Sequence, residues 1–184
     1  MLSMYRMAKT PQAASKKPAR AAALRPSPDQ LKKPASGRKT QVRLSPVHGK
    51  GVFALQPLAA GTRIFEYTGA VISWPEALRR HPHDPRNPNH TFYFHIDEDH
   101  VIDGKDGGNS ARWINHSCDP NCEADEVDGR VFVNAMHDLQ AGEELSYDYR
   151  LIIDERHTPK LKKEYECRCG AQSCRRTMLA AKRR

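Results

Sequence analysis

The chain has 184 residues, a formal net charge of +8 and five cysteines. This length suits one domain with a sizeable core, and no stretch reaches the roughly 18 apolar residues that a membrane span requires. The first residues also lack the apolar stretch of a secretory signal, so we expect neither a membrane protein nor an exported one.

The charge divides the chain into three parts. Residues 1–40 hold ten Lys and Arg against one acidic residue, residues 41–156 hold eleven against nineteen, and residues 157–184 hold nine against two. An acidic centre favours a cationic substrate, whereas basic ends favour nucleic acid or another polyanion, or are simply solvated extensions. Without an export signal, the cysteines are better interpreted as reduced thiols or metal ligands than as disulfides.

Residues 1–40 have a biased composition. Ala, Pro, Lys and Arg make up 23 of these 40 residues, and the tetrapeptide Lys-Lys-Pro-Ala occurs twice, at Lys16 and at Lys32. Such a segment has too little apolar surface to offset the entropy lost on ordering, so we expect it to be disordered.

From about residue 41 the sequence changes to short apolar runs separated by Gly, Pro, Asn and Asp, a pattern typical of β-structure. Two stretches resemble each other, Leu58–Gly61 and Leu139–Gly142, and each reads as a turn that leads into a strand. The expected strands are Gln41–Leu44, Gly51–Leu55, Thr62–Tyr67, Ala70–Ser73, Thr91–Ile96, His100–Ile102, Arg130–Ala135 and Glu144–Leu151.

One helix is predicted, beginning at Ser73. Ser73 can cap the helix, Pro75 tolerates an early helical position, and Glu76 stands where a capping box places its acidic residue. Three prolines between residues 82 and 88 require the helix to end near Arg80.

Three cysteines near the C-terminus suggest a metal site: Cys167, Cys169 and Cys174. Neighbouring arginines favour the thiolate form that binds metal. Three thiolates do not complete a tetrahedral zinc site, so a fourth ligand must come from Cys118, Cys122 or a histidine. The alternative is a group of free thiols.

Five motifs, taken together, resemble the SET-domain protein lysine methyltransferases. Residues 112–121, Arg-Trp-Ile-Asn-His-Ser-Cys-Asp-Pro-Asn, resemble the signature of that family. His48–Phe53 is similar to its N-terminal glycine turn, Glu66–Gly69 to the next strand and Glu144–Tyr149 to its C-terminal catalytic segment. The cysteine cluster is similar to its post-SET zinc module, and the resemblance covers residues 41–180.

The resemblance implies a mainly β, β-clip-like SET fold of several small sheets. In this fold the Asn-His-Ser-Cys segment threads beneath the catalytic segment as a pseudoknot. It implies a disordered basic tail at 1–40, a SET catalytic domain at 41–152 and a post-SET zinc module at 153–184. Cys118 would join Cys167, Cys169 and Cys174 around one structural zinc, which leaves Cys122 as a small buried residue.

The resemblance also implies transfer of a methyl group from S-adenosylmethionine to a lysine amine. Free lysine has a pKa near 10.4, so neutralising it at pH 7 costs about 4–5 kcal/mol, and a desolvating aromatic channel lowers this cost. By the family pattern Tyr149 supplies the essential hydroxyl, and Tyr67 lines the channel. Tyr147 limits the number of methyl groups, which predicts mainly monomethylation.

For the cofactor, the resemblance points to the glycine turn, a central strand, the signature motif and the zinc module. Relatives often place an aromatic residue after the last cysteine, where this chain has Thr177-Met178-Leu179, so the residue that covers the adenine is left open. The expected cofactor-binding residues are His48, Lys50, Gly51, Phe92 or Tyr93, Asn115, His116 and Arg168.

The expected partner is a lysine-bearing basic protein tail, such as that of a histone or histone-like protein. Methylation of the chain's own tail at Lys16, Lys17, Lys32 or Lys33 is a further hypothesis. Two alternatives stay open: a non-catalytic zinc module that binds nucleic acid through its basic ends, and a SET enzyme that acts on a non-chromatin protein. The expected location is cytoplasmic, or associated with chromatin or the nucleoid.

Overall fold

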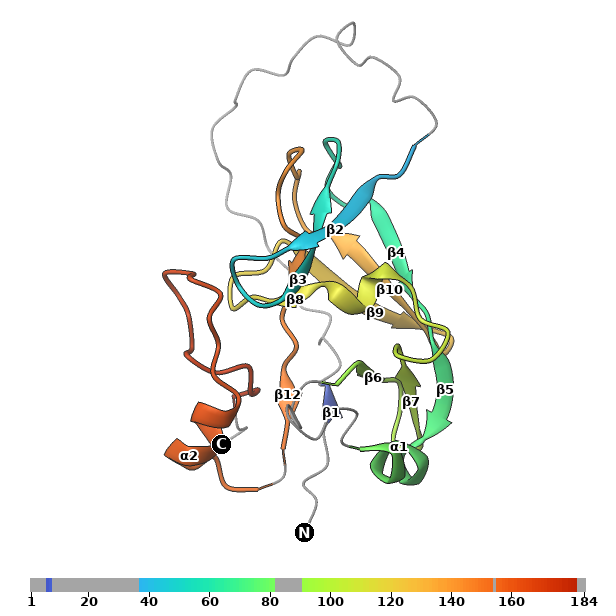
Figure 1. Cartoon of the computed structure of the whole chain (residues 1–184), viewed down its shortest axis with the longest axis vertical. Helices are drawn as coiled ribbons and strands as arrows, with labels where there is room; N and C mark the ends of the chain where they lie inside the picture. The colour runs from blue at the N-terminus through green and yellow to red at the C-terminus, as the bar shows by residue number, and fades with distance from the viewer. Residues whose placement is uncertain (1–5, 8–36, 82–90, 154, 182–184) are drawn as a thin grey trace, which may run out of the picture.

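The computed structural model describes residues 6–7, 37–81, 91–153 and 155–181 (Figure 1). The chain is mainly β, with short strands and two short helices in these ranges. The elements are β1 (Arg6–Met7), β2 (Thr40–Leu44), β3 (Lys50–Ala54), β4 (Arg63–Tyr67), β5 (Ala70–Ser73), α1 (Trp74–Arg80), β6 (Tyr93–His95), β7 (His100–Asp103), a 3₁₀ helix (Ser110–Trp113), β8 (Asn115–His116), β9 (Cys122–Val127), β10 (Arg130–Ala135), β11 (Ser146–Tyr147), β12 (Leu151–Ile152) and α2 (Pro159–Glu164).

The strands form several small sheets. Antiparallel sheets join β4, β10 and β9, then β5, β7 and β6, and then β2 and β3. Strand β8 pairs with β11 in parallel, and β1 pairs with β12 in an antiparallel sense. In Figure 1 the sheets of β2–β3 and of β4, β10 and β9 lie above the β5–β7–β6 sheet, and the C-terminal segment lies to one side.

One large apolar cluster holds the sheets together. Val131 and Val133 of β10 are fully buried, as are Val52 of β3 and Leu139 and Leu145 from the loops that follow β10. Each buried side chain of this size contributes about 1.5–3 kcal/mol through removal of apolar area from water. The cluster therefore fixes the frame to which the pocket residues are attached.

Two smaller clusters complete the interior. One packs Trp74 and Ala77 of α1 against Tyr93 and Val101. The other lies under the C-terminal segment and, among the residues that the structure describes, contains the buried residues Leu151, Ile153, Tyr165 and Leu179.

Most of the expected elements are present. Helix α1 has the predicted cap, since the Ser73 side chain accepts a hydrogen bond from the N–H of Glu76 at 3.4 Å. The two similar turns pair with each other, because Leu58 and Leu139 exchange main-chain hydrogen bonds of 3.0 and 2.8 Å. None of the helices in the described ranges is long and apolar enough to cross a membrane.

Several elements differ from the sequence-based prediction, among them β9, α2 and the expected strand Glu144–Leu151. Strand β9 was missed because its acidic residues disfavour strands, yet its pairing to the central strand β10 overrides that preference. Helix α2 was missed, although Thr158 caps it by accepting from the Leu161 N–H at 3.2 Å. The expected strand Glu144–Leu151 is broken, because Arg150 has a φ of 45° that interrupts extended structure.

Within residues 1–40 the structure describes only two short parts, so the expectation of disorder there stays a prediction. Arg6–Met7 form β1, and Thr40 is already part of β2. An extended segment can pair through its main chain whatever its composition. The rest of the stretch up to residue 36, with the lysines suggested as sites of self-methylation, lies outside the described residues.

Candidate functional site

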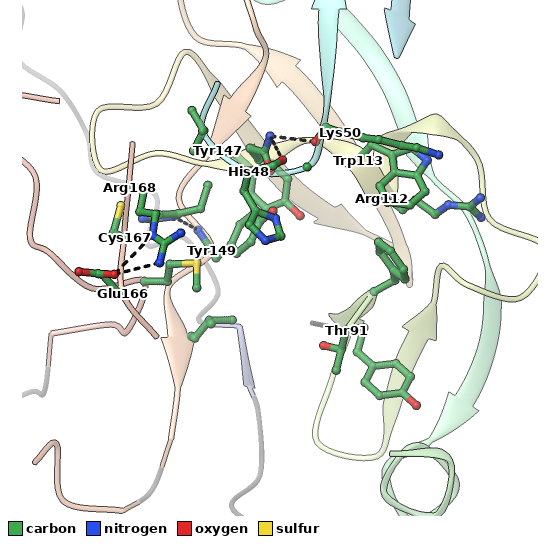
Figure 2. A pocket seen from close by; sticks show the side chains of 18 of the residues that line it. His48, Lys50, Thr91, Arg112, Trp113, Tyr147, Tyr149, Glu166, Cys167 and Arg168 are labelled. Carbon is green, nitrogen blue, oxygen red and sulfur yellow. Dashed lines mark hydrogen bonds and ion pairs between the residues drawn. The ribbon is translucent and has the colours of Figure 1, made fainter. Parts of the chain in front are cut away.

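A pocket of about 440 Å³ lies between the glycine turn, the aromatic residues of the sheets and the C-terminal segment (Figure 2). Ten of the eleven residues predicted to act in catalysis or cofactor binding line it, and Gly51 does not. The lining predicted residues are His48, Lys50, Tyr67, Phe92, Tyr93, Asn115, His116, Tyr147, Tyr149 and Arg168.

The two glycines of the turn have different roles. Gly49 lines the pocket and has a φ of +50°, a left-handed conformation that glycine adopts without strain. Gly51 lies on buried β3, where an added Cβ would come within 2.2 Å of a carboxylate oxygen of Glu144. Gly51 therefore allows close packing behind the pocket and does not contribute to its wall.

Asn115 connects this turn to the catalytic segment. Its amide nitrogen lies 3.0 Å from the carbonyl oxygen of Lys50, 3.3 Å from that of His48 and 2.7 Å from Oε1 of Glu144. The other carboxylate oxygen of Glu144 accepts from the Ser45 hydroxyl at 2.9 Å. The sequence analysis gave Glu144 no role, yet it anchors both sides of the turn.

The Asn-His-Ser-Cys segment lies directly beside the catalytic segment, as the resemblance implied. Asn115 and His116 pair in parallel with Ser146 and Tyr147. Asn121 strengthens the contact, because its amide donates to the Glu144 carbonyl and accepts from the Ser146 N–H, both at 2.8 Å. These side-chain bonds add to a pairing in which each segment supplies two residues.

His116 links the pocket to the cysteine cluster. Its Nδ1 accepts the N–H of Tyr149 at 3.1 Å, so the neutral ring carries its proton on Nε2, which lies 3.4 Å from Sγ of Cys118. Burial lowers the pKa of His116 to about 4, against the opposing effect of nearby Asp148. At neutral pH the ring is therefore uncharged and positions Tyr149 relative to Cys118.

Four aromatic rings line the inner end of the pocket and the space behind it. The ring centroids of Tyr147 and Tyr149 are 5.0 Å apart, those of Phe94 and Tyr147 6.1 Å, and those of Tyr67 and Phe94 5.2 Å. Phe94 was not predicted, although it alternates with Tyr93 on a strand whose position had been recognised. The group forms an apolar surface of the kind that disfavours a charged ammonium.

The tyrosine hydroxyls are held by main-chain carbonyls. Tyr149 donates to the carbonyl of Ile114 at 2.7 Å, and Tyr67 donates to that of Phe92 at 2.8 Å. Burial raises the pKa of Tyr67, Tyr147 and Tyr149 above the ordinary value. All three phenols stay protonated at neutral pH, so they act as polar groups in an apolar wall and carry no charge.

Phe92 and Tyr93, left as alternatives by the sequence, point in different directions. Phe92 stacks edge-to-face on Trp113 with centroids 4.9 Å apart. The Tyr93 side chain packs in the cluster around α1, where its hydroxyl donates to the Ala77 carbonyl at 3.1 Å. Phe92 therefore offers its ring to the pocket side, and Tyr93 secures the strand.

Trp113 and its cationic neighbours form a wall of the pocket that the sequence analysis did not assign. Nζ of Lys50 lies 4.6 Å from the centre of the Trp113 ring, and the Arg112 guanidinium lies 5.2 Å from it. Arg112 also donates to the Gly104 carbonyl at 3.0 Å. The sequence could have indicated this wall, because Arg112 and Trp113 are the first two residues of the recognised signature motif.

The C-terminal segment forms the opposite wall. Leu151 and Met178 line the pocket, and the N–H of Leu151 donates to the Met178 carbonyl at 3.1 Å. Arg168, which was predicted, also lines it and forms an ion pair with Glu166 at 3.3 Å. Met178 stands at the place where the sequence analysis left the covering residue open.

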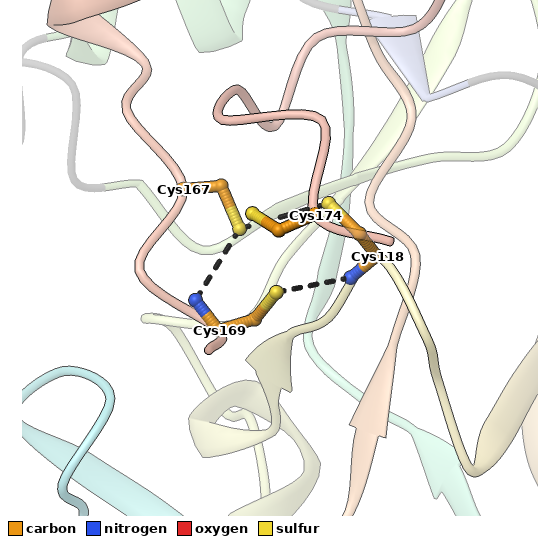
Figure 3. Close-up of side chains that lie close together, drawn as sticks. All are labelled: Cys118, Cys167, Cys169 and Cys174. Carbon is orange, nitrogen blue, oxygen red and sulfur yellow. Dashed lines mark hydrogen bonds between the residues drawn. The ribbon is translucent and has the colours of Figure 1, made fainter. Parts of the chain in front are cut away.

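Four cysteines face one another beside this wall (Figure 3). The Sγ atoms of Cys118, Cys167, Cys169 and Cys174 all lie within 4.8 Å of each other. Those of Cys118 and Cys167 are 3.7 Å apart, close to the roughly 3.8 Å between thiolates that share a tetrahedral zinc at about 2.3 Å. The donor set therefore fits zinc, and Cys118 is the fourth member that the resemblance supplied.

Cys122 lies apart from this group. It is 1% exposed within the large apolar cluster, and burial raises its pKa to about 12, so it stays a thiol.

One arginine near the cysteine group contacts the catalytic segment. The guanidinium of Arg175 donates to both carboxylate oxygens of Asp148 at 2.9 and 2.7 Å. This ion pair ties the cysteine segment to the catalytic segment.

Comparison with known proteins gives the arrangement a context. The family model of the SET domain matches residues 49–150. The chain is 34% identical over 148 residues to the histone-lysine N-methyltransferase SETD1 of Drosophila melanogaster, across 77% of this chain and 9% of that protein. It is 40% identical over 136 residues to a histone-lysine N-methyltransferase, H3 lysine-4 specific, of Kluyveromyces lactis, across 71% and 13%.

A third relative is the histone-lysine N-methyltransferase trr of Drosophila melanogaster, 38% identical over 140 residues. The match covers 73% of this chain and 6% of that protein. The chain thus spans about a tenth of the length of these relatives.

Proposed function

Because the chain belongs to the SET-domain family, we propose that it transfers the methyl group of S-adenosylmethionine to a lysine side chain of a histone or histone-like protein. The observation that carries this proposal is the convergence of Tyr67, Tyr147 and Tyr149 with Asn115 and His116 in one pocket. Proteins named as histone-lysine N-methyltransferases align with 77% and 71% of the chain.

The pocket suits S-adenosylmethionine in size and chemistry. A volume of about 440 Å³ lies in the range of small-molecule sites. Phe92 and Trp113 give the pocket an aromatic lining, the Gly49 turn lets the main chain approach a ligand closely, and Lys50 supplies a positive charge. When bound, the cofactor supplies an electrophilic methyl group on a positively charged sulfur.

The chain's own residues would prepare the amine. The rings of Tyr67, Phe94 and Tyr147 exclude water, which favours the neutral amine over the ammonium. The Tyr149 hydroxyl, fixed by the Ile114 carbonyl, orients groups at the place where amine and methyl group meet. Holding reactants in line in this way supplies a large part of the rate acceleration.

We propose monomethylation as the main outcome. Tyr147 is buried, and its ring lies between those of Phe94 and Tyr149, so the space for a methylated amine is narrow. A phenol at this place, in contrast to a phenylalanine, occupies additional volume and can hold a water molecule. Tyr147→Phe should therefore raise the proportion of dimethylated product.

In this proposal the zinc is structural. Four thiolates complete a tetrahedral coordination shell and leave no open position for a substrate. Cys118 follows His116 by two residues, and Cys167 and Arg168 both line the pocket. The metal would therefore hold the C-terminal wall against the catalytic segment.

The substrate is proposed from charge and from the relatives. The acidic centre of the chain favours a basic tail, which implies association with chromatin or the nucleoid. Contact of the basic ends with nucleic acid would add to this association. A SET enzyme that methylates a non-chromatin protein is the alternative.

Mass spectrometry of a substrate panel tests the proposal. The zinc-loaded chain is incubated with S-adenosylmethionine and with histones, histone peptides and unrelated basic proteins. We expect a shift of one methyl group on a histone lysine, lost in Tyr149→Phe. The matched control is Tyr165→Phe, the same change at a buried tyrosine that does not line the pocket.

Methylation confined to non-histone proteins would support the alternative substrate class. Retention of full activity in Tyr149→Phe would refute the role of its hydroxyl. Nucleic-acid binding without any methyl transfer would support the non-catalytic alternative.

A further inference from the structure

His116 stands between the cysteine group and Tyr149. The residue is 4% exposed, and each of its two ring nitrogens has its own neighbour. Nδ1 accepts the N–H of Tyr149 at 3.1 Å, and Nε2 lies 3.4 Å from Sγ of Cys118. The imidazole and the Tyr149 ring also pack together, with centroids 5.3 Å apart. One buried ring therefore contacts a proposed zinc ligand on one side and the proposed catalytic residue on the other.

Tyr149 is held at two points. Its N–H donates to His116, and its hydroxyl donates to the carbonyl of Ile114 at 2.7 Å. The next residue, Arg150, has a φ of 45° and takes the chain out of extended structure. The bond to His116 therefore fixes the main chain of Tyr149 immediately before this change of direction, and with it the direction of the phenol.

The sulfur atoms of the cysteine group accept hydrogen bonds, which favour the thiolate form. Each sulfur has a main-chain N–H at a distance from 3.3 to 3.5 Å, and the donors are Cys118, Cys169, Arg175 and Arg176. Figure 3 shows two of these contacts, from the N–H of Cys118 and from that of Cys169. Cys118 has a further donor, Nε2 of His116. A side chain of the pocket thus belongs to the outer shell of the proposed metal site.

The neighbours of His116 are compatible with two positions of its single N–H. When Cys118 is a thiolate bound to zinc, its sulfur only accepts, so the proton lies on Nε2 and Nδ1 accepts from Tyr149. When Cys118 is a thiol, its S–H can donate to Nε2. The proton then lies on Nδ1, which is 3.5 Å from Oδ1 of Asp148, and the N–H of Tyr149 loses its acceptor.

We propose that His116 is a positioning residue whose tautomer connects zinc binding at the cysteine group to the orientation of Tyr149. This inference rests on the proposed methyltransferase function, and it gives His116 a role apart from contact with the cofactor. On loss of the metal, the Cys118 sulfur takes up a proton from water, Nε2 releases its proton to water and Nδ1 takes one up. The ring is neutral in both states, so the change places no new charge in the interior.

Nitrogen NMR of the full chain, labelled with heavy nitrogen, tests the tautomer at constant pH. We expect the Nε2–H form in the zinc-loaded chain and the Nδ1–H form after chelation. The main-chain N–H of Tyr149 should exchange with solvent about ten-fold faster without zinc, because it has lost one hydrogen bond. The N–H of Ser117, which donates to the Tyr147 carbonyl at 3.2 Å, is the internal control and should keep its rate. The same tautomer in both states, or equal acceleration at both residues, would overturn the proposal.

Two variants separate the two ring nitrogens. The amide in His116→Asn reaches about as far as Nδ1 and can accept from Tyr149, whereas the amide in His116→Gln reaches about as far as Nε2 and can donate to Cys118. Zinc affinity should fall about 10–100-fold in His116→Asn and less in His116→Gln. At saturating zinc, kcat should be about ten-fold lower in His116→Gln than in His116→Asn, at a similar KM for S-adenosylmethionine. The same ranking of the two variants in both measurements would contradict the proposal.

Cobalt in place of zinc gives a readout that does not depend on activity. A hydrogen bond stabilises the electrons of a thiolate, so its loss in His116→Asn should move the sulfur-to-metal charge-transfer band to longer wavelength. The matched control is His137→Gln, a change at an exposed histidine that does not line the pocket, and it should keep zinc affinity, band and activity. Circular dichroism checks that each variant keeps its β-structure. An unchanged band in His116→Asn would refute the hydrogen bond to Cys118.

The histone peptide assay separates this inference from the function on which it rests. If the unmodified chain methylates no substrate while the His116 tautomer follows the metal, the proposed function is wrong and the connection between zinc and Tyr149 stands. If the chain methylates the peptide and the tautomer is the same with and without zinc, only this inference is refuted.

Discussion

Two regions of the chain are stabilised in different ways. One is the region around the large apolar cluster, and the other is the C-terminal segment, residues 148–181. The first, residues 37–147, places sixteen buried residues in that cluster, whereas the C-terminal segment contributes to a cluster of four. The burial of apolar area in the large cluster can stabilise a fold by itself. The small cluster buries too little apolar area to offset the conformational entropy that the C-terminal segment loses when it is ordered. The zinc proposed for the cysteine group would offset this difference, because a bound metal adds folding free energy.

This contrast explains how the pocket is built. Its glycine-turn wall and, apart from Tyr149, its aromatic wall belong to the well-packed region, and its wall of Cys167, Arg168 and Met178 belongs to the C-terminal segment. His116, whose Nδ1 accepts the N–H of Tyr149, and Cys118, whose Sγ lies 3.7 Å from that of Cys167, connect the two. Stability and activity should therefore respond differently to the same kind of change in each region.

The largest effect is expected from Cys174→Ser, or from thorough chelation of zinc. Loss of one ligand should release the C-terminal wall and lower methyltransferase activity by more than about 100-fold, while the circular dichroism of the β-structure is retained. Zinc content, activity and spectra are measured on the same samples. The matched control is Cys122→Ser, which should keep its zinc but lower the free energy of unfolding by about 1–3 kcal/mol.

Full activity in the zinc-free protein would show that the cysteine group does not organise the pocket. A loss of zinc in Cys122→Ser would place that residue in the site after all.

Truncation of apolar side chains should have a smaller effect than loss of zinc. Here the large cluster, and not the C-terminal segment, should be the more sensitive region in global unfolding. Leu139→Ala, in the large cluster, should lower the global free energy of unfolding by about 2–5 kcal/mol. Leu179→Ala, in the small cluster, should change global unfolding less and weaken zinc binding more. Urea unfolding combined with zinc competition distinguishes the two results. Equal losses of global stability would mean that both regions unfold as one unit.

The smallest effect concerns a surface pair within the well-packed region. The hydrogen bonds from Arg130 lower the pKa of Glu66. A carboxylate with a lowered pKa contributes stability above its unfolded pKa, and this contribution is lost as pH falls through the folded value. In an NMR titration Arg130→Gln should raise the pKa of Glu66 toward its ordinary value, and zinc affinity at neutral pH should not change. An unchanged pKa would show that the pair does not form in solution.

The sequence by itself determined the parts that depend on local chemistry. Helix α1 follows from Ser73, Pro75 and Glu76, which act within one turn of chain. The trio Cys167, Cys169 and Cys174 suggested a metal, because closely spaced thiols offer ligands without any knowledge of the fold. The five motifs in order identified the family, since their residues lie in nearly contiguous stretches.

Only the tertiary structure decided which distant residues meet. Gly51 packs against Glu144 and not against the pocket, Phe94 joins the tyrosines, and β9 forms despite its acidic residues because β10 pairs with it. The pairing of β1 with β12 could not be read from the sequence either, since main-chain hydrogen bonds carry no signature in side-chain composition. Local patterns record propensities, but contacts between distant segments depend on the packing of the whole chain.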